Sequence, residues 1–436
     1  MKLLFSATLL LLFLIACKPQ NAGPNKEEDI NQLVREYVRL ALTIGQYDQS
    51  FVDAYYGPDS LKPAIKVSAV FPKDSLLKVT NVLLASILKF SEGNNPDSVK
   101  NRAGWIADQL VAFGRRIRIY SGEYGTFDEE SKDLFGVAAP VYDENHYKTL
   151  VSQLDKILPG KGSIPDRFQT LANKFIIPKT KLDTVFKTAI AESRRRTKEH
   201  YQLPSNESFS LEYVNNKPWN GYNWYKGNYT SLIQINTDLN IFIDRAIDVG
   251  SHESYPGHHV YNMLLEKNLY RDKGLTEISM YPLFSPQSLI AEGTANYGID
   301  VVFPGDDKIK FARDILLPIA GLDTAGITVY IKAIEIKGQL NYARNEAARG
   351  IINKTMTEEE ALRWLKEYAL FNDETAAKSI NFIKVNRSYV INYNYGQDLV
   401  RGYVESRIKN DPTPENRWKV FGELMSHEVR ISDLKK

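Results

Sequence analysis

The chain has 436 residues, of which 43% are hydrophobic, 25% are charged and 11% are aromatic. These are the proportions of a globular protein, so they exclude a wholly disordered, a collagen-like or a polytopic membrane protein. With 55 basic and 53 acidic side chains the net charge is only +2, which gives no electrostatic reason to expect a nucleic-acid partner.

The first residues predict an export signal of the lipoprotein type. After one lysine, an almost wholly apolar run covers 3–16, too short to span a bilayer comfortably but as long as a signal-peptide core. It ends in Leu-Ile-Ala-Cys at 14–17, which resembles a bacterial lipobox, and Cys17 is the only cysteine of the chain. We expect a signal peptide over 1–16 and lipidation of Cys17. The alternative is an ordinary signal peptide with an incidental cysteine.

The next segment is polar and contains proline and glycine, so 17–26 is expected to be the lipidated cysteine and a flexible tether. The acyl chain would make a membrane the first partner of the protein. It would place the protein at the bacterial cell envelope, periplasmic or surface-exposed. Lys18 in place of Asp after the cysteine favours the outer over the inner membrane, as in enteric bacteria.

Most of the following chain has the periodicity of amphipathic helices, first seen in 27–43. Thr357 with Glu360 three residues later is the pattern of a capping box. Similar apolar stripes predict helices near 75–90, 99–120, 180–201, 324–348, 357–371 and 413–428.

The composition changes near residue 204. Proline, asparagine and glycine accumulate over 204–229, and 230–237 then shows the alternation of a strand, before a helix expected at about 239–253. We therefore divide the body into a helical N-terminal region, 27–203, and a second region, 204–436, although the two can also form one domain.

Three of the six histidines lie in the sequence His-Glu-Ser-Tyr-Pro-Gly-His-His at 252–259. Imidazole and carboxylate groups are the usual ligands of a catalytic zinc, which in the common H-E-x-x-H pattern is bound by histidines one helical turn apart. On an unbroken helix, His252 and His258 would be about 600° apart, on nearly opposite faces. His252 and His259 would share a face but stand about 10.5 Å apart along the axis.

Pro256 resolves this conflict because a proline inside a helix lacks the N–H and clashes with the preceding turn, while Gly257 tolerates unusual backbone angles. A break at Pro256 would bring His258 to the position of the second histidine of H-E-x-x-H. We favour His252 and His258 as zinc ligands, with His259 as the alternative to His258.

The third ligand is expected from a following helix. Glu292 stands in Ile-Ala-Glu-Gly-Thr, 40 residues after His252, and Gly293 would allow close helix packing. An ordinary surface glutamate is the alternative. Asp248, one turn before His252, could orient the imidazole through a hydrogen bond. It could also simply support the helix.

The motif His-Glu-x-x-Pro-Gly-His-His followed by Glu-Gly-x-x-x-Tyr resembles the bacterial domain-of-unknown-function family 885, which is itself similar to the gluzincin metallopeptidases. The segment Asp-Ala-Tyr-Tyr-Gly-Pro at 53–58 fits the same relatives. The resemblance implies a mainly α, zincin-like (gluzincin) helical body with a small β-sheet beside the zinc-binding helix. The chain departs from that family in being shorter than many members and in carrying Thr294 where a large aromatic often follows the Glu-Gly.

The residue types predict a zinc-dependent hydrolase, most of all a metallopeptidase that cleaves peptides at the cell envelope. One Zn²⁺ would activate water, and Glu253 would be the general base. For the oxyanion donor, the phenol-rich segment near 390 offers Tyr393 and Tyr395, with Arg387 beside them. The strand over 230–237 either pairs with an extended peptide substrate or is a buried structural strand.

Two further functions remain open on the sequence. A surface lipoprotein without catalytic activity could bind glycans or peptides, since 25 tyrosines and 5 tryptophans suit stacking on sugars. A zinc-dependent amide or ester hydrolase with a non-peptide substrate would need the same site residues.

Overall fold

The structure, a computed structural model, describes residues 26–64, 69–217 and 219–435. The predicted signal peptide, Cys17 and nearly all of the predicted tether lie outside the described residues. Among the described residues, no helix combines the length and the apolar character needed to cross a membrane.

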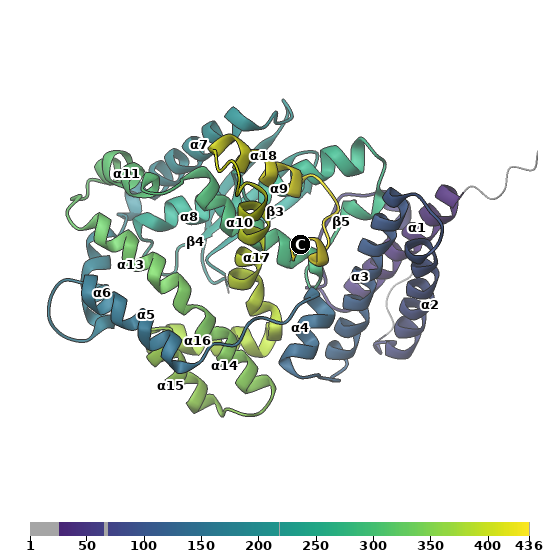
Figure 1. Ribbon diagram of the computed structural model, residues 1–436, viewed down its shortest axis with the longest axis horizontal. Helices are drawn as coiled ribbons and strands as arrows, with labels where there is room; N and C mark the ends of the chain where they lie inside the picture. The colour runs from purple at the N-terminus through teal and green to yellow at the C-terminus, as the bar shows by residue number, and fades with distance from the viewer. Residues whose placement is uncertain (1–25, 65–68, 218, 436) are drawn as a thin grey trace, which may run out of the picture.

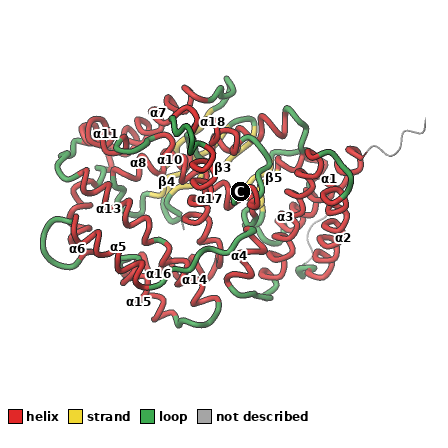
Figure 2. The backbone as a smooth tube through the Cα atoms, in the orientation of Figure 1, coloured by secondary structure: helices red, strands yellow, loops and turns green. Residues whose placement is uncertain are grey.

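Helices make up most of the molecule and surround two small sheets near its middle (Figures 1 and 2). In the first half the helices are α1 (Lys26–Gly45), α2 (Lys73–Glu92), α3 (Asp97–Tyr120), α4 (Phe127–Phe135), α5 (Glu144–Ile157), α6 (Ile164–Ala172), α7 (Leu182–His200), α8 (Ile243–Glu253) and α9 (His258–Leu265). In the second half they are α10 (Pro286–Val302), α11 (Asp307–Phe311), α12 (Leu317–Ala320), α13 (Ile327–Leu340), α14 (Tyr342–Ile352), α15 (Glu358–Tyr368), α16 (Asp373–Asn386), α17 (Ile391–Arg407), α18 (Pro414–Met425) and α19 (Ile431–Leu434).

Short 3-10 and π segments connect these helices. They are η1 (Asp59–Leu61), η2 (Asn173–Phe175), η3 (Lys179–Lys181), η5 (Thr276–Ser279) and η7 (Arg387–Val390), with π geometry in η4 (Glu266–Arg271) and η6 (Ala312–Leu316).

The strands are β1 (Val52–Tyr55), β2 (Ser208–Val214), β3 (Gly221–Gly227), β4 (Thr230–Asn236) and β5 (Met280–Pro282). β1 and β5 form an antiparallel pair, and the other three form a sheet in the order β2-β4-β3. β4 is therefore the central strand, parallel to β2 and antiparallel to β3. Because both of its edges are hydrogen-bonded, β4 cannot pair with a substrate, and of the two roles considered for it the structural one is correct.

The fold class predicted from the sequence, a mainly α body with a small sheet beside the helix that carries His252, is confirmed. Each predicted helical stripe lies in a helix, and the Thr357–Glu360 capping box starts α15. One prediction needs correction: the stripe over 324–348 is two helices, α13 and α14. They meet at Asn341, whose carbonyl accepts a hydrogen bond from the Asn394 side chain (3.3 Å).

The long axis of the molecule runs from the α1–α3 bundle at one end to α6 and α13 at the other (Figure 1). Between these ends, α10 packs along α17 and also contacts α8 and α9. A continuous hydrophobic core extends from Ile30 in α1 to Leu434 in α19. α10 lies deep within this core, so side chains on α8, α9 and α10 can meet on a rigid support. The division of the chain at residue 204 stays a prediction.

Candidate metal centre

The histidine motif lies at a break between two helices. α8 ends at Glu253 and α9 begins at His258, with Pro256 between them, as the sequence predicts. A Cβ at Gly257 would lie only 1.9 Å from the carbonyl oxygen of His252. Only glycine therefore fits this position, and the close approach of the two backbones brings the start of α9 back beside the end of α8.

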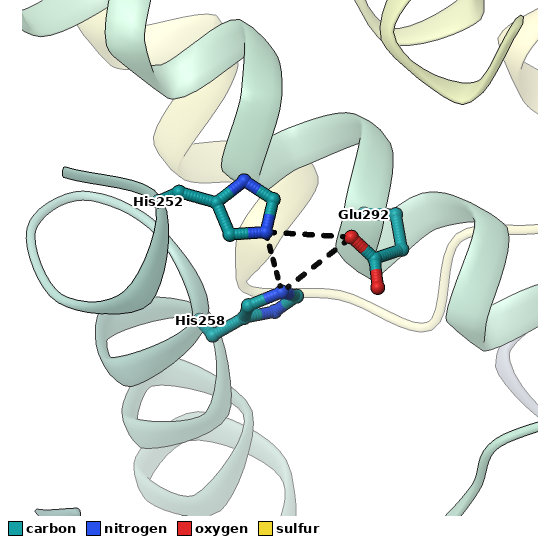
Figure 3. A group of neighbouring side chains, drawn as sticks. All are labelled: His252, His258 and Glu292. Atoms are coloured by element: carbon teal, nitrogen blue, oxygen red, sulfur yellow. Dashed lines mark hydrogen bonds and ion pairs between the residues drawn. The ribbon is translucent and has the colours of Figure 1, made fainter. Parts of the chain in front are cut away.

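The break turns two imidazoles toward one carboxylate (Figure 3). His252 Nε2 and His258 Nε2 lie 3.1 Å apart, and Glu292 Oε2 lies 3.4 Å from the first and 3.7 Å from the second. The edge of a tetrahedron around a zinc ion with bonds of about 2.0–2.1 Å is about 3.3–3.4 Å. The three atoms thus have the spacing of three tetrahedral ligands, and the group fits a metal ion.

The chemistry of the three groups also fits a cation. Glu292 Oε2 is buried and has no hydrogen-bond partner among the described residues, while Oε1 accepts a hydrogen bond from the Tyr389 hydroxyl (3.0 Å). Burial opposes ionisation of Glu292, but His252 and His258 outweigh it and hold the pKa of the carboxyl below its usual range. A buried, ionised oxygen without a donor, facing two imidazoles, is a site that a metal ion would satisfy.

Asn296, one turn after Glu292 on α10, fixes the orientation of His252. Its Nδ2 donates to the carbonyl oxygen of Tyr393 (2.9 Å), so its Oδ1 faces His252 Nδ1 at 3.0 Å. This oxygen can only accept, so Nδ1 carries the ring proton and Nε2 keeps its lone pair toward the centre.

The sequence offered Asp248 for this orienting role, with support of the helix as the alternative, but the Nδ1 atom of His252 pairs with Asn296 instead. The carboxylate of Asp248 acts electrostatically on Lys308, Asp244 and Tyr330. The Nδ1 atom of His252 faces α10, where Asn296 is available, so no place is left for a partner one turn earlier on α8.

His259, the alternative ligand, is not at the centre. Its side chain is fully buried, with Nδ1 2.8 Å from Ser231 Oγ and Nε2 3.3 Å from Glu207 Oε2. Burial disfavours the ionised form of Glu207, but hydrogen bonds from His259, Tyr255 and Arg194 lower its pKa to about 2. His259 therefore anchors α9 to β4 and to the segment before β2. Between the two neighbouring histidines, the geometry selects His258.

Glu253, the predicted general base, ends α8 next to the centre. Its side chain is buried and lines a cleft of about 840 Å³, and burial raises its pKa to about 7. Asn223 Nδ2 on β3 donates to the backbone oxygen of Glu253 (2.6 Å). Gly221 on the same strand leaves room for the carboxylate, since a Cβ there would lie 3.1 Å from Glu253 Oε1. β3 thus fixes Glu253 in position.

The cleft contains a further carboxylate near the centre that the sequence did not identify. Asp53 on β1 accepts a hydrogen bond from the Tyr222 hydroxyl on β3, and both line the cleft. Burial raises the pKa of Asp53 to about 6, while the nearby His258 acts in the opposite direction. Asp53 is the first residue of the Asp-Ala-Tyr-Tyr-Gly-Pro segment. Its position in this motif is the one feature of the sequence that could have marked it as a site residue.

Of the three residues predicted to supply an oxyanion donor, only Tyr393 lines the cleft. Arg387 forms a two-pronged ion pair with buried Glu130 (2.7 and 2.8 Å), which fixes η7 against α4. Tyr395 points elsewhere, near Tyr142. Neither Arg387 nor Tyr395 lines the cleft, so these two predictions are corrected. Tyr395 lies two residues after Tyr393 on α17 and therefore faces a different direction.

Tyr389 is the residue of this phenol-rich segment that reaches the centre most directly, through its bond to Glu292. It is four residues before Tyr393 and therefore on nearly the same face. The four-residue spacing of Tyr389 and Tyr393 could be read from the sequence. The sequence did not reveal that this side of the helix points toward the cleft.

Comparisons with known proteins give fold relatives only. Neither a protein-family model nor a curated protein sequence matches the chain. A predicted lipoprotein from Colwellia psychrerythraea superimposes with a TM-score of 0.51 at 12% identity, over 81% of this chain and 69% of that chain. This likeness shows a common fold.

Two more distant structures also align. A predicted lipoprotein of unknown function from Shewanella oneidensis has a TM-score of 0.44 at 11% identity, over 94% of this chain and 80% of its own. Metallocarboxypeptidase 1 of Trypanosoma cruzi has a TM-score of 0.46 at 10% identity, over 93% of this chain and 94% of its own.

Proposed function

We propose that the protein is a zinc-dependent hydrolase, most of all a metallopeptidase that cleaves peptides at the bacterial cell envelope. The observation that carries the proposal is the tetrahedral spacing of His252, His258 and Glu292 around one point, with the buried Glu253 carboxyl beside them. Two histidines, a distant glutamate and a separate base are the components of a catalytic zinc site.

Each side chain at the site would have a separate role in the reaction. His252, His258 and Glu292 would hold the ion, which when bound supplies a Lewis acid and makes water acidic enough to ionise near neutral pH. Glu253 would accept the proton of the attacking water at its carboxylate and donate it to the leaving amine. The hydroxyl of Tyr393, a residue that lines the cleft, would donate a hydrogen bond to the developing oxyanion.

We further propose membership of the domain-of-unknown-function family 885, supported by the His-Glu-x-x-Pro-Gly-His-His and Glu-Gly motifs. Attachment to a membrane through Cys17 is supported by the lipobox and by fold relatives that are themselves predicted lipoproteins.

Metal content tests the centre first. The full-length protein, extracted in detergent and purified without chelator, should contain about one zinc per chain by elemental mass spectrometry. His252→Ala, His258→Ala and Glu292→Ala should each lose it, whereas His259→Gln should retain it. A wild-type protein that binds no stoichiometric metal after zinc is added would rule out the enzyme and leave the glycan- or peptide-binding lipoprotein, to be tested on glycan arrays.

Glu253→Gln tests the chemistry. The variant should keep its zinc and its melting temperature but cleave peptides about 100- to 10,000-fold more slowly, since the amide cannot accept the proton. Turnover at the wild-type rate would exclude Glu253 as the base. Activity on ester or amide substrates with no activity on a peptide library would indicate the non-peptide hydrolase.

A further inference from the structure

Asp53 is an acidic side chain of the cleft to which the proposed reaction assigns no role. Glu292 faces the two histidines and Glu253 is the proposed base, whereas Asp53 lies on β1, outside the group of three candidate ligands. It is nonetheless close to the centre, since its charge acts on Glu253 and is itself affected by those of His258 and Glu292. A partner of Asp53 would therefore lie beside the reacting bond.

An irregularity in the pairing of β1 turns Asp53 toward the cleft. The residues on either side of it, Val52 and Ala54, lie opposite adjacent residues of β5, so Asp53 is an extra residue of β1 with none opposite it. Bulges of this kind commonly redirect a side chain next to an active site. Accordingly Val52 and Asp53 both line the cleft, whereas adjacent residues of a regular strand point to opposite faces.

One oxygen of the Asp53 carboxylate is left for a ligand. Oδ1 accepts the hydrogen bond of the Tyr222 hydroxyl, which orients the group. Among the described residues none donates a hydrogen bond to Oδ2, and none forms an ion pair with the carboxylate. The raised pKa of Asp53 has the same origin, because burial disfavours the charge and no cation in contact with it offsets that effect.

The basic residues around the cleft do not compensate Asp53. The two lysines of the lining, Lys217 and Lys378, are exposed, and neither forms an ion pair with it. The charge of Lys226 reaches Asp53, but this lysine is also exposed and forms no ion pair with it. A positive group that enters the cleft with a substrate would therefore find an unpaired carboxylate, whereas a negative group would be repelled by the three carboxylates near the centre.

We propose that Asp53 binds a positively charged group of the substrate and so selects peptides that carry such a group close to the scissile bond. The inference rests on the proposed peptidase function. A cation would give Oδ2 a charge-assisted hydrogen bond, about twice as strong as a bond from a neutral donor. The group can be the free amino terminus of the peptide or the side chain of a basic residue.

Binding measurements test this subsite without requiring turnover. Zinc-loaded full-length Glu253→Gln protein in detergent serves as the parent, and calorimetry measures its affinity for two peptide pairs. The first pair is Ala-Ala-Ala-amide and propionyl-Ala-Ala-amide, which lacks only the terminal amine. The second is N-acetyl-Ala-Lys-Ala-amide and its norleucine analogue, which lacks only the side-chain amine. The charged member of at least one pair should bind about 10- to 100-fold more tightly than its neutral partner. The pair that responds identifies the source of the cation.

Asp53→Asn in the parent should abolish this preference, because the amide keeps an acceptor for Tyr222 but carries no charge. Asp238→Asn, the same change at an exposed acid of the same cleft, should retain it. Asp53→Asn should also keep its zinc and melt at the temperature of the parent or above it, because the lost charge was unfavourably buried. An Asp53 with a purely structural role would give a lower melting temperature and leave the preference intact.

A parent protein that binds no peptide, or binds both members of each pair equally, overturns the subsite. So does a preference that survives Asp53→Asn or is lost equally in Asp238→Asn. If the preference depends on Asp53 but wild-type protein cleaves none of these peptides or a wider library, the subsite stands and the peptidase function fails. If wild-type protein cleaves peptides without any preference for a positive group, the peptidase function stands and the subsite fails.

Discussion

Glu292 is held at the centre by a hydrogen bond from a residue 97 positions later in the chain. The Tyr389 hydroxyl donates to Oε1, which leaves Oε2 facing His252 and His258. Groups that fix the free atom of a metal ligand commonly change metal affinity by about 10- to 100-fold when removed.

Tyr389→Phe is therefore expected to weaken zinc binding about 10- to 100-fold, because the carboxylate loses its only hydrogen-bond donor among the described residues. Competition with a chromophoric chelator measures this affinity. Tyr395→Phe, which removes a phenol six residues later and outside the cleft, is the matched control and should bind zinc as the wild type does. Equal affinities in the two variants would exclude Tyr389 as a support of the ligand.

Most of the candidate ligands could be predicted from the sequence because the chemistry of histidine and glutamate is specific and Pro256 marks the break. The choice between His258 and His259 could not, since helix phase has no meaning across residues that are not helical. Asn296 and Tyr389 were missed for a different reason. Their amide and phenol groups are common in cores. Only the packing of α10 against η7, which carries Tyr389, and against α17 directs them to the site.

At the scale of helices, the contact between α10 and α17 places both Glu292 and η7, the segment directly before α17 that carries Tyr389. A Cβ at Gly293 would lie 2.4 Å from the backbone oxygen of Gly396, and a Cβ at Gly396 would lie 2.7 Å from that of Leu289. The two glycines thus let the helix backbones touch, as the Glu-Gly sequence suggested for α10. Any side chain here would push α17, and with it Tyr393, away from the centre.

We expect Gly396→Ala to lower the free energy of unfolding by about 1–3 kcal/mol through overpacking. Gly402→Ala, on the same helix but with nothing within 4 Å of its Cβ, should instead raise it by about 0.5–1 kcal/mol through helix propensity. Urea denaturation of the two variants measures the difference. If Gly396→Ala is as stable as the wild type, the close contact does not limit the packing of α10.

The amphipathic helices could be predicted from their apolar periodicity. The helix α10 could be predicted only because Glu292 was expected to be a ligand on a following helix. Helices such as α1 and α15 alternate buried and exposed faces, which produces a visible period. Nearly every residue of α10 is buried, so no polar face marks its period. The strand at β4 was visible from its alternation, but alternation does not reveal which strands lie beside it, and its central position followed only from the structure.

Across the whole molecule, the last residues of the chain close back onto the first helices. Arg430 pairs with Asp108 on α3 through two hydrogen bonds of 2.7 and 3.0 Å. Nearby, Arg102 on α3 pairs with buried Glu277, and Glu428 lies within electrostatic range of both. Two carboxyls thus share the surroundings of one buried guanidinium.

Burial, together with the charge of Glu277, raises the pKa of Glu428 to about 8. The folded protein therefore binds a proton that the unfolded chain releases above about pH 4.5, so this group lowers stability as pH rises from about 4.5 to 8. The free energy of unfolding of the wild type should therefore fall between pH 5 and pH 9. In Glu428→Gln this fall should be smaller by about 1–3 kcal/mol. Urea melts at both pH values measure it, with Glu423→Gln, an exposed carboxylate on α18, as the control. A wild-type-like pH dependence in Glu428→Gln would contradict the raised pKa.

The contact of α17 with α10 also has a consequence for the order in which the protein can acquire its site. All three candidate ligands lie between residues 252 and 292, so they leave the ribosome together. Tyr389 and Gly396, which hold α10 in place, follow about a hundred residues later. A nascent chain that ends at α16 has every ligand but lacks both Tyr389 on η7 and the helix α17, which together position Glu292. Synthesis of α17 is therefore the step that completes the centre.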